Sequence, residues 1–157
     1  MSDAEVGPDD IERAARRIDG LVRRTPIIES GPLILKLELL QHAGSFKPRG
    51  AANRLLAERE RGALPAAGVV AASGGNHGAA VAYVSQALGV AAEVFVPSTS
   101  PAMKRANIER FGARVHVVEG YYDDAQAAAD ARQRAGGALL MHPFDHCLLY
   151  TSDAADE

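Results

Sequence analysis

The chain is poor in the features that mark secreted, membrane and nucleic-acid-binding proteins. Its only cysteine is Cys147, so no disulfide framework can form within its 157 residues. No charged-then-apolar leader opens the chain, and no apolar run approaches the length needed to cross a bilayer. We therefore expect a cytoplasmic protein with no membrane partner.

The last segment, Cys147–Glu157, matches the translation of a transposon-end sequencing adapter read from its second base. We expect it to be an artefact of cloning or sequencing and not part of the folded protein. Without Asp153, Asp156 and Glu157 the formal net charge changes from −3 to zero. A neutral chain with no basic stripe gives no reason to expect a nucleic-acid partner.

Aromatic residues are also scarce, at 5% of the chain, and tryptophan is absent, whereas alanine and glycine are abundant. This composition is typical of helices packed closely on a parallel sheet. The chain is 47% hydrophobic, which is enough to bury one core of ordinary size.

Segments with helical and strand periodicity alternate along the chain. A helix is expected from Asp9 or Asp10 to Leu21, a short strand over 33–39, and a helix from an N-cap at Ser45 to Arg61. Further strands are expected over 69–72, 92–96, 114–118 and 138–142, with helices over 77–88, 101–111 and 122–135. Repeated strand–helix–strand units require right-handed crossovers. The predicted fold is therefore α/β, a three-layer parallel sheet with helices on both faces.

Two motifs carry chemistry. Lys47 lies in Gly-Ser-Phe-Lys-Pro-Arg-Gly-Ala, residues 44–51, and a second motif, Ser-Gly-Gly-Asn-His-Gly, spans residues 73–78. A lysine amine forms an imine with an aldehyde only when unprotonated, so such a lysine needs a desolvated or electropositive pocket, which Phe46 suits. The second motif follows a strand at the sheet edge where ligands bind, and its small residues let backbone N–H groups approach an anion. Together they predict a lysine-bound cofactor.

These motifs, with Leu35-Lys36-Leu37-Glu38 and Gln41 before them, resemble the threonine/serine dehydratase branch of the fold-type II pyridoxal-phosphate enzymes. The resemblance runs over residues 11–146. It implies pyridoxal 5'-phosphate as cofactor and β-elimination of L-threonine or L-serine to a 2-oxo acid and ammonia. It also implies that residues 1–40 belong to a large cofactor domain and residues 41–146 to a small α/β domain.

The resemblance assigns roles to individual residues. Lys47 would hold the cofactor covalently and shuttle the α-proton, Phe46 would lie against its ring, and Asn76 would hydrogen-bond its phenolic oxygen. The residues expected to bind the substrate carboxylate are Ser73, Gly75, Asn76 and His77.

Other polar residues are expected to be structural. Arg49 braces its loop and Glu38 pairs locally in this interpretation, and no metal site is expected, because His42, His116 and His142 lack metal-ligand spacing.

Departures from the family pattern refine the expectation. Gly74 stands where the racemase branch carries an acid/base serine, which favours elimination. The segment before Lys47 also differs from that of cysteine and threonine synthases. No glycine-rich phosphate-binding loop follows, so we expect a truncated, N-terminal fragment that is inactive alone. We also expect the full-length parent to be a homo-oligomer.

Two alternatives remain. One is another fold-type II enzyme, such as a serine racemase. The other is a non-catalytic, Rossmann-like module that binds a nucleotide or phosphate at residues 73–78, although neither a GKS/GKT loop nor GxGxxG supports it.

Overall fold

The fold is known from a computed structural model that describes residues 6–143. The segment interpreted as adapter, Cys147–Glu157, and the expected end of the small domain at residue 146 lie outside the described residues. Within the described part, no helix is both long and apolar enough to cross a membrane.

A parallel sheet forms the centre of the molecule. Its strand order is β5-β4-β3-β6, with β3 at Val69–Ala72, β4 at Ala92–Pro97, β5 at Arg114–Val118 and β6 at Leu139–Leu140. All of β3 is buried because it pairs on both edges and is covered on both faces. The predicted strands are confirmed, although β6 is shorter than the expected 138–142.

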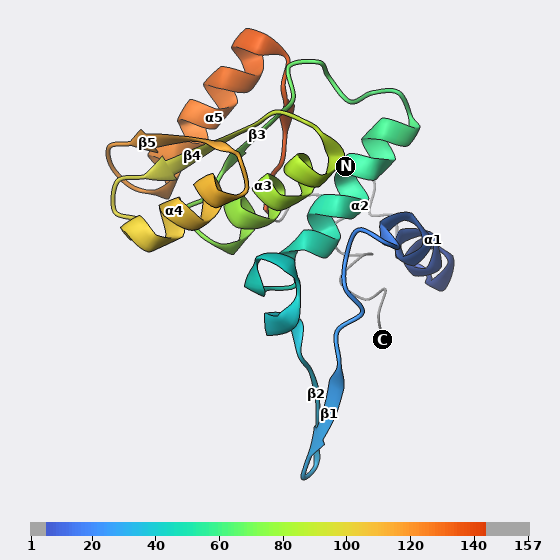
Figure 1. Ribbon diagram of the computed structural model, residues 1–157. Coiled ribbons are helices and arrows are strands. Elements are labelled where there is room, and N and C mark those ends of the chain that lie inside the picture. Colours follow the sequence, from blue (N-terminus) through green and yellow to red (C-terminus); the bar gives the residue numbers. More distant parts are fainter. Residues whose placement is uncertain (1–5, 144–157) are drawn as a thin grey trace.

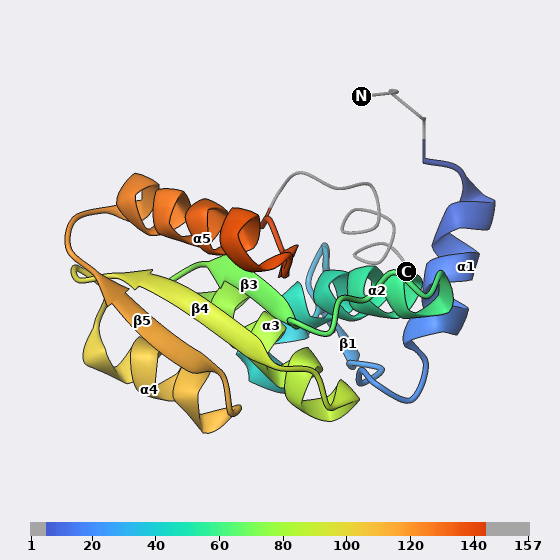
Figure 2. The same ribbon diagram turned by 90° about the horizontal axis from the view of Figure 1, so that it is seen from above.

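Helices cover both faces of this sheet (Figure 2). On one face lies α5 (Tyr122–Gly136), whose Ala125 and Ala129 pack with Val70 and Phe95. The opposite face carries α3 (Asn76–Leu88) and α4 (Ala102–Arg110), where Val94 and Ile108 form a second core. The predicted three-layer α/β fold is confirmed.

Two further helices extend the layer on the α3 side. The helix α2 (Lys47–Glu60) packs on α3, and α1 (Pro8–Ile18) packs on α2. Their core joins Ile18, Leu55 and Val81 to the buried side chain of Val69.

A β-hairpin projects from this body (Figure 1). Its strands are β1 (Ile27–Ser30) and β2 (Leu33–Lys36), which pair in antiparallel register around the turn at Gly31, where φ is 58°. The expected strand over 33–39 therefore ends early, because Glu38–Leu40 forms a 3-10 turn, and β1 was not predicted. Large apolar side chains of the hairpin are exposed: Ile27, Ile28, Leu33, Ile34 and Leu35.

Two predicted helix starts were wrong. The first helix begins at Pro8 rather than at an Asp9 or Asp10 cap, and Asp10 instead accepts a hydrogen bond of 3.0 Å from the backbone N–H of Gly7. Ser45 does not cap α2, because Phe46 already has helical backbone angles and occupies the N-cap position.

Candidate active site

The segment before Lys47 is a compact reversal of the chain. A second 3-10 turn, His42–Gly44, contains Ala43 at φ 61°. The buried Gln41 side chain fastens it: its Oε1 accepts from the N–H of Arg23 at 2.9 Å and from that of His42 at 3.0 Å, and its Nε2 donates to the Arg23 carbonyl at 2.8 Å. Gln41 thus holds the chain in place a few residues before the lysine.

Lys47 is the first residue of α2 and is partly exposed. Its Nζ lies 4.8 Å from the centroid of the Phe46 ring, which is itself 39% exposed. The hydroxyl of Ser45 is buried and has no hydrogen-bond partner among the described residues. An apolar ring, an amine and a buried hydroxyl thus lie on consecutive residues, and the amine is the group that can form an imine with an aldehyde cofactor.

Arg49 braces this corner, as predicted. Its side chain is 1% exposed, and Nη2 and Nε donate to the Glu38 carboxylate at 2.7 and 3.0 Å. Nη2 also donates to the Arg23 carbonyl at 3.1 Å. Burial raises the pKa of Glu38, but hydrogen bonds from Arg49 and Thr25 and the charges of Arg49 and Lys36 outweigh it and lower the pKa. The pair ties the end of the hairpin to the first turn of α2.

The Ser73–Gly78 loop follows β3 at the carboxyl edge of the sheet. The N–H of Ser73 continues the pairing to Phe95 O at 3.0 Å, and the Ser73 hydroxyl accepts from the N–H of Gly75 at 3.2 Å. Gly75 is the N-cap of α3, so the first-turn N–H groups of that helix face the loop. Asn76 is exposed at this helix end. This arrangement is suited to binding a carboxylate.

His77 is buried, with Nε2 2.8 Å from the carbonyl oxygen of Met141. A carbonyl only accepts, so Nε2 carries the proton and the ring of a neutral His77 has no second donor. Burial lowers the pKa of His77 to about 4, the bond to Met141 raises it in part, and the charges of Lys47 and His142 lower it further. The backbone N–H of His77 is therefore its available donor.

The structure brings the two motifs together. The 3-10 turn before Lys47 and α2 itself both pack on α3, and the charge of Lys47 acts on His77 at the start of α3. The contacts of Gln41, Thr25 and the Met141 carbonyl were not predicted, because each depends on segments far apart in sequence.

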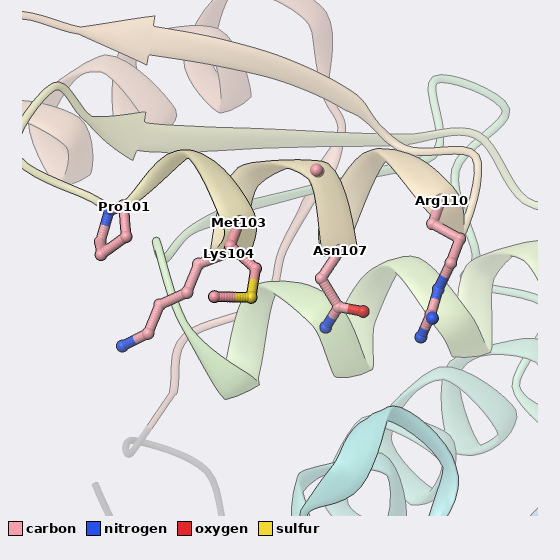
Figure 3. A pocket seen from close by; sticks show the side chains of 6 residues that line it. Pro101, Met103, Lys104, Asn107 and Arg110 are labelled. Carbon is pink, nitrogen blue, oxygen red and sulfur yellow. The ribbon is translucent and has the colours of Figure 1, made fainter.

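Two surface hollows lie apart from the Ser73–Gly78 loop. One of about 640 Å³ runs along α4, where Figure 3 shows Met103, Lys104 and Asn107 on one side of the helix. Another, of about 450 Å³, lies between the turns before Lys47 and the end of α4. Neither includes Lys47 or a residue of the loop.

Comparison with known proteins identifies the family. The model of the family described as "Pyridoxal-phosphate dependent enzyme" matches residues 18–152. This chain belongs to that family. The predicted resemblance to threonine dehydratases is confirmed by proteins that this chain matches. An L-threonine ammonia-lyase of Geobacter sulfurreducens is 40% identical over 147 residues, which are 88% of this chain and 36% of that protein.

Solved structures show the same fold. A threonine deaminase from the organism abbreviated T.th. matches with a TM-score of 0.84 and 36% identity, covering 96% of this chain and 49% of that one. Maize serine racemase matches with a TM-score of 0.85 and 32% identity, covering 92% of this chain and 46% of that one. The chain thus spans about 36% to 49% of these relatives' length.

Residues of the described chain fit one side of a pyridoxal-phosphate site. The amine of Lys47, the Phe46 ring and the buried Ser45 hydroxyl lie at the start of α2, and α2 packs on α3, whose first-turn N–H groups face the Ser73–Gly78 loop. The cofactor's phosphate also needs an anchor, and no other glycine-rich loop of this kind occurs in the sequence.

Proposed function

We propose that this chain is part of a pyridoxal-phosphate-dependent ammonia-lyase that converts L-threonine or L-serine to a 2-oxo acid and ammonia. The observation that carries the proposal is that α2, which begins at Lys47, and the 3-10 turn before it both pack on α3, which begins within the Ser73–Gly78 loop. The names of the relatives, among them L-threonine ammonia-lyase and threonine deaminase, support this substrate class.

Residues of this chain would take distinct parts in the reaction. The Lys47 amine would hold the cofactor and later move the α-proton, with the Phe46 ring excluding water beside it. Asn76 would donate to the cofactor's phenolic oxygen. Ser73, Gly75, Asn76 and His77 would hold the substrate carboxylate, His77 through its backbone. Bound pyridoxal phosphate would supply an electron sink for the charge that develops at the α-carbon.

The proposal extends to domain organisation. Residues 1–40 would join a large domain completed by the remainder of a longer parent, and residues 41–146 would form the small domain. The exposed apolar hairpin supports this division, since a parent chain could cover it. We propose that the parent is a homo-oligomer and that this chain alone is inactive.

Racemisation is the second candidate, because serine racemase shares this fold at 32% identity. Gly74 has no side chain that could serve as an acid or base, which favours elimination. The family match over residues 18–152 favours a pyridoxal-phosphate-dependent enzyme over the nucleotide-binding alternative.

A test uses the full-length parent. Borohydride reduction followed by peptide mass spectrometry should find the cofactor on Lys47, and L-threonine or L-serine should yield a 2-oxo acid. Lys47→Ala should abolish both, whereas Lys104→Ala, on the outer face of α4, should change neither. Cofactor on another lysine, with Lys47→Ala still active, would refute the proposal.

A further inference from the structure

Gly74, in the middle of the Ser73–Gly78 loop, lies where the fold leaves no room for a side chain. Its φ is outside the left-handed region that favours glycine, so its backbone would accept a side chain. A Cβ built there, however, would lie 1.9 Å from the hydroxyl oxygen of Ser100 and 2.8 Å from its Cβ. Ser100 therefore occupies the place that a side chain of residue 74 would take.

Ser100 is held at this place by its own turn. The residue ends the connection from β4 to α4, just before Pro101, which Figure 3 shows at the start of that helix. Its N–H donates to the Pro97 carbonyl at 2.9 Å, and the same turn is tied to β5 because Ser98 N–H donates to the Val118 carbonyl at 2.7 Å. Backbone hydrogen bonds thus hold the backbone of Ser100, and with it the Cβ, beside Gly74.

The Ser100 hydroxyl is also available for a ligand. The residue is partly exposed, and its hydroxyl has no hydrogen-bond partner among residues 6–143. Two nearby serine hydroxyls already accept hydrogen bonds: that of Ser98 from Gly120 N–H at 3.3 Å, and that of Ser73 from Gly75 N–H. The Ser100 hydroxyl neither donates nor accepts within the described chain.

We propose that Ser100 is a further substrate-binding residue, whose hydroxyl donates a hydrogen bond to the carboxylate of the amino acid bound at the Ser73–Gly78 loop. This inference rests on the proposed function. The loop supplies backbone N–H donors for the carboxylate, and Ser100 adds a side-chain donor from a different segment, in the place of the side chain that Gly74 lacks. The bond would form with substrate and persist through the reaction, so its loss should weaken binding rather than slow turnover.

The contact itself is tested by stability in the full-length parent. Gly74→Ala should lower the midpoint of thermal unfolding by about 2–4 °C, because the new methyl group meets Ser100. Adding Ser100→Gly should restore most of that loss. If the double variant is as unstable as Gly74→Ala alone, Ser100 does not occupy this space and the inference fails.

The binding role is tested with Ser100→Ala in the cofactor-loaded parent, with Thr99→Ala as the matched control. Ser100→Ala should raise KM for L-threonine about tenfold, as for one lost hydrogen bond to a charged group, while kcat stays within about twofold. Calorimetric titration with L-alanine, which has the carboxylate but no β-hydroxyl to eliminate, should show the same loss of affinity. Thr99→Ala should change neither quantity by more than about twofold.

The outcomes separate this inference from the proposed function. A parent that binds pyridoxal phosphate and L-alanine but makes no 2-oxo acid overturns the proposed function, and the L-alanine titration still decides the role of Ser100. A parent that turns over L-threonine normally, with Ser100→Ala binding L-alanine as the unaltered parent does, overturns this inference alone. A fall in kcat with unchanged KM also overturns it.

Discussion

At the residue scale, His77 is an imidazole that the fold keeps neutral. Its folded pKa of about 4 lies below the ordinary value of 6.5, so the unfolded chain takes up a proton before the folded one does. The stability this residue contributes is complete above pH 6.5 and is lost as the pH falls from there toward 4.

We therefore expect His77 to lower the free energy of unfolding by about 2 kcal/mol at pH 5 relative to pH 7.5. His77→Gln, whose amide can still donate to the Met141 carbonyl, should remove that share of the pH dependence. Urea unfolding at both pH values measures it. His42→Gln, at a half-buried histidine stacked on Tyr83, is the control and should have a smaller effect. An unchanged pH slope in His77→Gln would contradict the assignment.

Arg49 and Glu38 form a second residue-scale case. Arg49→Met should lower the free energy of unfolding by about 3 kcal/mol, because it strips a mostly buried carboxylate of its partner. Arg16→Met, at an exposed pair with Glu12, should cost less than about 1 kcal/mol. Combining Arg49→Met with Glu38→Met should recover part of the loss. Full additivity of the two single changes would show that the pair is not coupled.

At the scale of elements, the first turn of α3 lies close to the end of β3. A Cβ at Gly78 would lie 2.5 Å from the Ser73 carbonyl and 3.0 Å from Ile108 Cδ1, whereas one at Gly75 would meet nothing within 4 Å. Gly78→Ala should thus lower the free energy of unfolding by about 1–3 kcal/mol, and Gly75→Ala by less than about 0.5 kcal/mol. Denaturant titration compares the two. Equal effects would mean that α3 can move away from the sheet without cost.

The hairpin is the element with the most exposed apolar surface. Ile34 is 74% exposed in this chain. Ile34→Ser should therefore change the unfolding free energy of the chain little, but it should destabilise a full-length parent by about 2 kcal/mol if the parent covers the hairpin. Thermal unfolding of both proteins decides this. A substitution that is neutral in the parent would contradict the proposed domain division.

At the scale of the whole molecule, the chain carries Lys47 and the Ser73–Gly78 loop but covers only part of its relatives' length. We expect the parent to retain pyridoxal phosphate through gel filtration and the 157-residue chain to lose it, because we propose that the parent's remainder supplies the phosphate anchor. Absorbance of the protein peak measures retention, with Lys47→Ala in the parent as control. Retention by the chain alone would show that its own residues suffice. Resequencing the gene across Cys147 tests the adapter interpretation separately.

Local patterns in the sequence determined much of this protein. Alternating strands and helices required a parallel sheet, β5 was predicted to the residue, and Gly89 and Gly137 end their helices in the left-handed conformation, as a glycine stop favours. The two motifs identified the family by their order and spacing, since both are short contiguous segments whose chemistry is local.

Tertiary structure decided what depends on contacts between distant segments. The strand β1 escaped prediction because its pairing with β2, rather than an apolar pattern of its own, makes it a strand. His77 is neutral because the folded chain buries its ring, and the hydrogen bond to the Met141 carbonyl, 64 residues away, raises its pKa only in part. The sequence shows only that Gly74 lacks a side chain. The folded chain shows that Ser100 occupies the place where a side chain of residue 74 would lie, because the turn after β4 brings Ser100 next to Gly74.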